Sequence, residues 1–138
     1  MVKLAVFASG SGTNFENIVN RINDGTIKNA AVALLVVDKE HAKAIERAKR
    51  LDIPWVYVNP KAFPSKAEYE EEILQYLRKR KVDLIALAGY MRIVSPVLLA
   101  AYPKRIVNLH PAYLPYFPGK QSILDAYNAK AVSYTHLR

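Results

Sequence analysis

The chain has 138 residues, of which 51% are hydrophobic, so it is long enough to fold as one globular domain with a real core. It contains no cysteine, which excludes a disulfide scaffold and any thiolate metal site. Its 20 Lys and Arg residues against 12 Asp and Glu residues give a formal net charge of +8, which favours anionic small molecules as ligands. With no apolar run long enough to span a membrane and no signal peptide pattern, we expect a cytoplasmic protein.

Part of the positive charge is concentrated in the Arg-Lys-Arg-Lys run at residues 78–81. Such a cluster could contact nucleic acid. It also ends a predicted helix, where cations interact favourably with the helix dipole, and no aromatic residues alternate with the basic ones. We therefore favour the helix-end interpretation and expect no nucleic-acid partner.

Apolar runs alternate with amphipathic stretches along most of the chain. The expected strands are residues 3–8, 31–37, 54–58, 82–88 and a run that ends at His110. The expected helices are residues 14–22, 39–51, 65–81 and 95–102. This alternation predicts an α/β fold, a mainly parallel open sheet with helices on both faces.

Three of the helix starts carry capping signals. Thr13 with Glu16, and Ser65 with Glu68, have the spacing of a capping box. The Ser-Pro step at residues 95–96 combines an N-cap residue with proline at the first helical position. We therefore expect helices to begin at these three points.

Two polar side chains end the last predicted strand. Asn108 and His110 are two residues apart, so they project from the same face of the strand, and Pro111 then ends it. The carboxyl ends of parallel strands are where open α/β sheets bind ligands. The pair is therefore either a catalytic hydrogen-bond donor beside a titratable imidazole, or a capping Asn beside a surface His.

A second candidate site precedes the first predicted helix. Residues 9–14 read Ser-Gly-Ser-Gly-Thr-Asn, and glycines before a helix let backbone N–H groups approach a phosphate, although an ordinary glycine turn has the same composition. The loop is not a P-loop, because Gly12 is followed by Thr13, and Phe15 replaces the third glycine of the dinucleotide fingerprint. Asp38 stands where a ribose-binding acid would, so a dinucleotide enzyme is the competing interpretation.

Three motifs together resemble the phosphoribosylglycinamide (glycinamide ribonucleotide) formyltransferase family, folate-dependent enzymes of purine synthesis. The motifs are Ala-Ser-Gly-Ser-Gly-Thr-Asn at 8–14, Leu-Ala-Gly-Tyr-Met-Arg-Ile at 87–93, and Asn-Leu-His-Pro at 108–111, continuing through Leu-Pro at 114–115 to Phe-Pro-Gly at 117–119. Their order and spacing agree with the family to about residue 131. This agreement is more specific than any single motif.

The resemblance implies transfer of a formyl group from 10-formyltetrahydrofolate to the amine of glycinamide ribonucleotide. It implies that Asn108 and His110 are catalytic. It places the ribonucleotide phosphate at Gly12, Thr13 and Asn14. It places the folate at Lys66, Met91, Arg92, Ile93, Val94 and Asn108. Lys66 stands where the family often has arginine, and lysine keeps the charge but lacks the planar fork.

Other functions remain open alongside this one. Related folate enzymes share the Asn-x-His-Pro core, so formyltetrahydrofolate hydrolase and methionyl-tRNA formyltransferase are alternatives. A nucleotide-phosphate-binding α/β domain without catalysis is the non-enzyme alternative. No metal is expected, because His41, His110 and His136 lack ligand spacing. The expected partners are glycinamide ribonucleotide and folate, with no nucleic acid and no membrane, in a monomer or a homodimer.

The resemblance also suggests how the chain is divided. We expect a formyltransferase domain over residues 1–131, incomplete at its C-terminus, because the family continues into a strand whose aspartate pairs with the catalytic histidine. Residues 132–138 resemble the translated adapter of transposon-based sequencing libraries, and we interpret them as a non-native tail. We expect the 138 residues alone to have little activity.

Overall fold

The computed structural model describes residues 1–109. His110, the proline-rich segment at 111–119 and the expected tail at 132–138 lie outside the described residues. Five strands form one sheet in the order β3-β2-β1-β4-β5, and every pairing is parallel. The strands are β1 (Val2–Ala8), β2 (Ala30–Val37), β3 (Trp55–Tyr57), β4 (Leu84–Leu87) and β5 (Ile106–Asn108).

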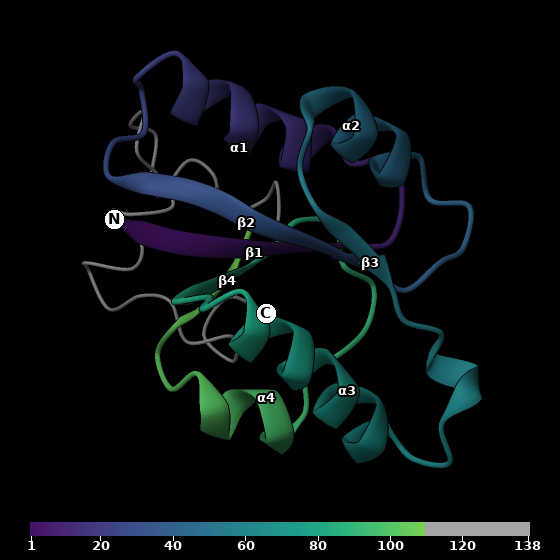
Figure 1. The fold of residues 1–138 in the computed structure, drawn as a ribbon. Helices are drawn as coiled ribbons and strands as arrows, with labels where there is room; N and C mark the ends of the chain where they lie inside the picture. The colour runs from purple at the N-terminus through teal and green to yellow at the C-terminus, as the bar shows by residue number, and fades with distance from the viewer. Residues whose placement is uncertain (110–138) are drawn as a thin grey trace.

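Helices cover both faces of this sheet. α1 (Thr13–Asn23) and α2 (Lys43–Leu51) lie on one face, and α3 (Lys66–Lys79) and α4 (Pro96–Ala101) lie on the other (Figure 1). A short 3-10 turn, η1 (Pro60–Ala62), precedes α3. The predicted α/β fold with a parallel sheet between two helical layers is confirmed. Within residues 1–109, every helix is too short or too polar to cross a bilayer.

The core has two layers because the central strand is buried on both faces. Leu4 and Val6 of β1 pack with α1 and α2, whereas Ala5 and Phe7 pack with α3 and α4. Successive strand residues point to opposite faces, so one strand serves both layers. All four side chains are fully buried, as expected for the middle of a parallel sheet.

The capping box predicted at Thr13 is wrong. The N-cap of α1 is Gly12, with φ of 78°, and no side chain caps this helix start. Glu16 does not reach back to the helix start, because Arg47 and Arg50 of α2 both bind its carboxylate. The ion pairs with a neighbouring helix therefore replace the local cap.

The second helix begins later than the predicted residue 39. α2 begins at Lys43, and residues 39–42 form turns before it. The backbone N–H of Ala44 donates to the carbonyl oxygen of Gly10 (3.2 Å). The start of α2 is therefore held by the glycine loop rather than by the apolar periodicity alone.

The other two helix starts are confirmed. Ser65 caps α3 by accepting a hydrogen bond from the backbone N–H of Glu68 (3.2 Å). Ser95 is the N-cap of α4, and Pro96 is its first residue. The hydroxyl of Ser95 does not cap the helix, because it donates to the Glu70 carboxylate (2.6 Å).

Candidate functional site

The sequence-predicted site residues within 1–109 come from three neighbouring strands. The glycine loop follows β1, residues 91–94 follow β4, and Asn108 ends β5. β1, β4 and β5 are adjacent in the sheet and parallel, so these segments meet at its carboxyl edge. The structure thus brings together residues that the sequence places far apart, while His110 lies outside the described residues.

The glycine loop is a tightly packed structure. Gly12 has φ of +78°, and a Cβ there would lie 2.6 Å from both Cα and Cβ of Ala44. Only glycine fits this position without a shift of backbone. The hydroxyls of Ser11 and Thr13 are 2.8 Å apart and share a hydrogen bond. Thr13 and Asn14 lie in the first turn of α1, where helix N–H groups are available to an anion.

A guanidinium group supports the same loop from α2. Arg47 donates from Nε to the carbonyl oxygen of Ser11 (2.7 Å) and also binds Glu16. Hydrogen bonds from Arg50 and Arg47 hold the pKa of Glu16 below its usual range. The sequence analysis missed Arg47, because no motif marks it and its partner is 36 positions away.

An open hollow adjoins the glycine loop. Its lining combines the Ser-Gly-Ser sequence at residues 9–11 with residues 39–43, and its volume is about 570 Å³. Lys39 and Lys43 bring cationic side chains to it, Glu40 an acidic one and His41 an imidazole. Within residues 1–109 no three His, Cys, Asp or Glu side chains are grouped as a metal site requires. The hollow therefore has charged residues along residues 39–43, and the described residues contain no cluster of metal ligands.

Residues 91–94 are held to their surroundings at successive positions. The backbone N–H of Met91 donates to Ser9 Oγ (2.9 Å), and Lys66 Nζ donates to the carbonyl oxygen of Ile93 (2.9 Å). Val94 is buried in the layer beneath α3 and α4. Lys66 therefore lies beside the residues with which the resemblance groups it, although its ammonium binds backbone here.

Two large apolar side chains project from this fixed segment. Met91 is 79% exposed and Ile93 is 50% exposed. Within residues 1–109 only Met1 and Trp55 are further large hydrophobic side chains with comparable exposure. Exposed apolar groups on a rigid backbone are typical of a ligand-binding surface.

Asp38 does not occupy the role that the dinucleotide interpretation requires. Its side chain is 1% exposed, and its Oδ2 atom accepts a hydrogen bond from Arg92 Nε (3.0 Å). A carboxylate this buried does not reach a ribose hydroxyl. The structure therefore removes the main support for a dinucleotide site.

A pair of tyrosines lies beneath Arg92. The hydroxyls of Tyr69 and Tyr90 are 2.7 Å apart, and the Arg92 guanidinium lies 5.9 Å from the centre of the Tyr69 ring. Burial raises the pKa of Tyr69 to about 12 and also raises the pKa of Tyr90. Both hydroxyls are therefore neutral at physiological pH. The sequence analysis missed this hydrogen bond, because its two partners are 21 positions apart.

Asn108 is half-buried at the end of β5. It pairs in register with Leu87, the last residue of β4, and the N–H of Leu109 donates to the carbonyl oxygen of Leu87 (2.8 Å). This pairing places Asn108 next to the strand end from which residues 91–94 depart. Asn108 thus lies at the same carboxyl edge of the sheet as the other predicted site residues within 1–109.

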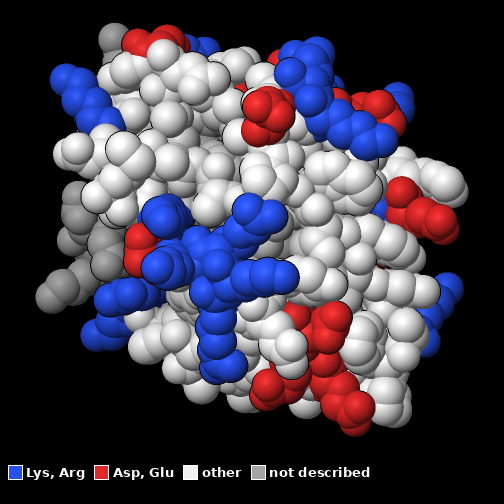
Figure 2. Space-filling view, in the orientation of Figure 1, with Lys and Arg blue, Asp and Glu red and all other residues white. Residues whose placement is uncertain are grey.

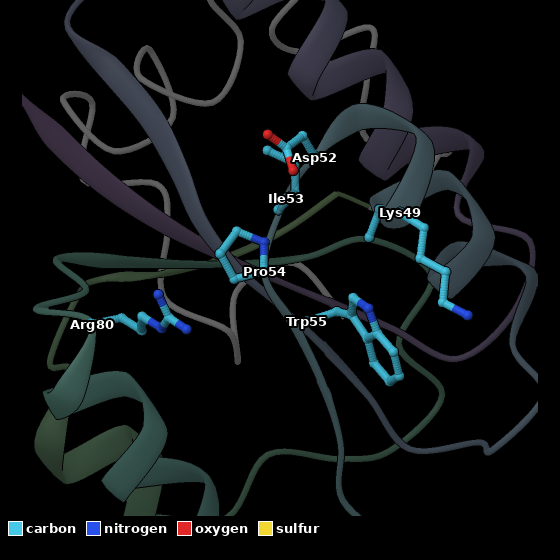
Figure 3. A pocket seen from close by; sticks show the side chains of 7 residues that line it. Lys49, Asp52, Ile53, Pro54, Trp55 and Arg80 are labelled. Atoms are coloured by element: carbon cyan, nitrogen blue, oxygen red, sulfur yellow. The ribbon is translucent and has the colours of Figure 1, made fainter.

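A second hollow lies away from all of these residues. Figure 3 shows Lys49 and Trp55 on one side of it and Arg80 on the other. Its volume is about 470 Å³, and Lys49 Nζ lies 5.6 Å from the centre of the Trp55 ring. Trp55 begins β3, so this hollow is at the amino edge of the sheet. It contains none of the sequence-predicted site residues.

Comparisons with known proteins agree with one another. A family model described as "Formyl transferase" matches residues 2–133. The chain is 49% identical over 129 residues to the phosphoribosylglycinamide formyltransferase of Bacillus subtilis, covering 94% of this chain and 66% of that protein. It is 46% identical to the chloroplastic phosphoribosylglycinamide formyltransferase of Arabidopsis thaliana, covering 86% of this chain and 40% of that protein. The chain thus spans less than two thirds of the length of either relative.

A solved structure shows the same similarity in three dimensions. The crystal structure of glycinamide ribonucleotide transformylase 1 from Geobacillus kaustophilus matches with a TM-score of 0.79 and 56% sequence identity. The match covers 94% of this chain and 68% of that one. The sequence match to the Bacillus subtilis relative and this structural match therefore cover the same share of this chain, 94%.

Proposed function

Because the chain belongs to the formyl transferase family, we propose that the whole protein transfers the formyl group of 10-formyltetrahydrofolate to the amine of glycinamide ribonucleotide. The names of the Bacillus and Arabidopsis relatives support this acceptor. One structural observation carries the proposal. The glycine loop and the exposed Met91 and Ile93 lie at one edge of the sheet, and the Ser9–Met91 hydrogen bond joins them.

Each half of this edge suits one substrate. Gly12, Thr13 and Asn14 would hold the ribonucleotide phosphate, since the packed loop presents the start of α1 to an anion. The formyl donor would contact an apolar surface bordered by polar groups. Its proposed contacts are Lys66, Met91, Arg92, Ile93, Val94 and Asn108.

The proposed chemistry is acyl transfer. The acceptor amine attacks the formyl carbon, a C–N bond forms, and negative charge develops on the formyl oxygen. The Asn108 amide donates a hydrogen bond to that oxygen, as does a protonated His110. The attacking nitrogen, positively charged after addition, gives up a proton to solvent, the bond to the folate nitrogen breaks, and His110 delivers a proton to the departing nitrogen. The part of His110 is taken from the family resemblance.

Removing either group in the whole enzyme tests the proposal. We expect Asn108→Ala to lower kcat on the order of 10²–10³-fold, because an oxyanion donor is lost. His110→Ala is expected to lower it on the order of 10²–10⁴-fold. Asn17→Ala, on the exposed face of α1, is the matched control and should leave turnover unchanged. Near-normal turnover in either site variant, measured by the change in folate absorbance, would remove the assignment.

Omitting the acceptor separates transfer from hydrolysis. A transferase consumes 10-formyltetrahydrofolate only when glycinamide ribonucleotide is present, whereas a hydrolase releases formate without it. Equal rates of donor consumption with and without the ribonucleotide would replace the proposed function by formyltetrahydrofolate hydrolysis. Binding of the ribonucleotide without turnover would instead support a phosphate-binding domain.

A further inference from the structure

The buried polar side chains within residues 1–109 share one task. They are Ser9, Asp38 and Glu70, which lie in the loop after β1, directly after β2 and in the body of α3. Each binds the segment at residues 91–98, which includes the loop after β4 and the first turn of α4. Burying a polar group is costly unless it forms a hydrogen bond. Three buried polar side chains that all bond to one segment therefore hold that segment in place.

Two of the three are fully explained by their bonds. Ser9 accepts from the backbone N–H of Met91 (2.9 Å). Glu70 accepts from the backbone N–H of Ser95 (2.9 Å), from its hydroxyl, and from the N–H of Leu98 (3.1 Å). Glu70 thus satisfies the free donors at the start of α4, which need partners.

Asp38 differs from these two. Its Oδ2 atom binds Arg92 Nε, but its Oδ1 atom is buried without a hydrogen-bond partner within the described residues. Arginine and a carboxylate frequently pair through two parallel hydrogen bonds. A buried ion pair with one unpaired carboxylate oxygen does not by itself indicate a gain in the stability of the fold. The buried position of Asp38 therefore calls for another role.

The Asp38 carboxylate fixes Arg92 between two elements. On one side Arg92 binds the end of β2 through Asp38, and on the other its guanidinium lies over the Tyr69 ring of α3. The backbone on either side of Arg92 is held as well, at Met91 by Ser9 and at Ile93 by Lys66. With three consecutive residues fixed, the Met91 and Ile93 side chains have a defined direction into solvent.

We infer that Asp38 is a positioning residue for the formyl-donor site, acting through Arg92 to preform the apolar surface of Met91 and Ile93. The inference rests on the proposed function, because it assigns that surface to the folate. Asp38 itself does not touch the donor. A surface that is ordered before binding lowers the cost of ordering it on binding, so the effect falls on affinity for the donor.

Steady-state kinetics of the whole protein provide the first test. We expect Asp38→Asn to raise KM for 10-formyltetrahydrofolate on the order of tenfold, because the Met91 and Ile93 side chains would then be ordered only on binding. Arg92→Gln, which also changes a proposed donor contact, should raise this KM at least as much. KM for glycinamide ribonucleotide and kcat should stay within about twofold. The double variant should be no worse than the more affected single variant, because the two side chains act as one unit.

A matched control separates this pair from ion pairs in general. Arg21 and Asp24 form an exposed pair (2.9 Å) at the far end of α1. Asp24→Asn makes the same chemical change there and should alter neither KM. Arg92 is about one third exposed (34%), so in Asp38→Asn its charge still reaches water, and this variant is expected to fold even where Arg92→Gln, which leaves the buried Asp38 carboxylate without its charged partner, does not.

Hydrogen exchange gives a readout that does not need activity. In the whole protein without substrates, both site variants should speed amide exchange at residues 91–94, and Asp24→Asn should not. A wild-type protein without formyl transfer would overturn the proposed function, while the exchange result would still decide the positioning role. Unchanged exchange and donor KM in both variants, or an equal rise in both KM values, would overturn the inference.

Discussion

The two edges of the same sheet handle polar groups in opposite ways. At the carboxyl edge, Ser9, Asp38 and Glu70 are buried and bind the segment after β4. At the amino edge, the basic residues 78–81 at the end of α3 are all exposed. Figure 2 shows Lys and Arg side chains gathered over that end of α3. The difference teaches that, within residues 1–109, the buried Ser, Asp and Glu side chains lie where they hold a loop that can form part of a site.

The largest effect on stability is expected from replacing a glycine by alanine, and one glycine at each edge allows the comparison. Gly12→Ala would place Cβ 2.6 Å from Ala44 atoms, and Gly25→Ala, at a similar φ of +84°, would meet nothing within 4 Å. Both pay about 1–2 kcal/mol for the left-handed backbone, and Gly12→Ala adds about 1–3 kcal/mol of overpacking. Urea denaturation measures both. Equal losses would show that the glycine loop is no tighter than the turn after α1.

Next in size is the loss of a buried carboxylate compared with an exposed one. Glu70→Gln replaces an acceptor of three hydrogen bonds and should lower the free energy of unfolding by about 1.5–3 kcal/mol. Asp83→Asn changes an exposed acceptor of the Lys3 N–H (2.9 Å), at the amino edge, and should cost under about 1 kcal/mol. Thermal and urea unfolding report both values. A larger loss in Asp83→Asn would reverse the comparison.

The smallest effect is a dependence of stability on alkaline pH. Burial raises the pKa of Tyr69 to about 12, so the unfolded chain loses this proton first as pH rises. The contribution of Tyr69 to the free energy of unfolding is therefore fully present below about pH 10 and is lost between about pH 10 and 12. Tyr69 and Tyr90 together should contribute more of this decline than Tyr102, because burial raises the pKa of two tyrosines there and of one at Tyr102.

Urea midpoints at pH 9 and pH 11 check this order. The double variant Tyr69→Phe, Tyr90→Phe should flatten the difference between the two midpoints more than Tyr102→Phe does. Tyr102 donates to the carbonyl oxygen of Val82 (2.9 Å) near the amino edge, so it is the matched buried tyrosine. If Tyr102→Phe reduces the difference between the midpoints more, the loss of stability at alkaline pH arises mainly from Tyr102 at the amino edge.

The sequence by itself determined the order of elements and most of their extents. The run predicted at residues 3–8 is β1, and the Ser65 cap and the Ser-Pro step begin α3 and α4. These features depend on periodicity and on contacts within one turn, which a single stretch of sequence contains. The motifs also placed the glycine loop, residues 91–94 and Asn108 at strand ends.

Only the tertiary structure decided which side chains meet across those ends. Arg92 and Asp38 are 54 positions apart, and Arg47 and Glu16 are 31 apart. Pairs of this kind overrode the cap predicted at Thr13 and changed Asp38 from a candidate ribose ligand into a buried partner of Arg92. Local pattern does not encode them, because a hydrogen bond or ion pair depends on the distance between atoms after the layers have packed, not on spacing along the chain.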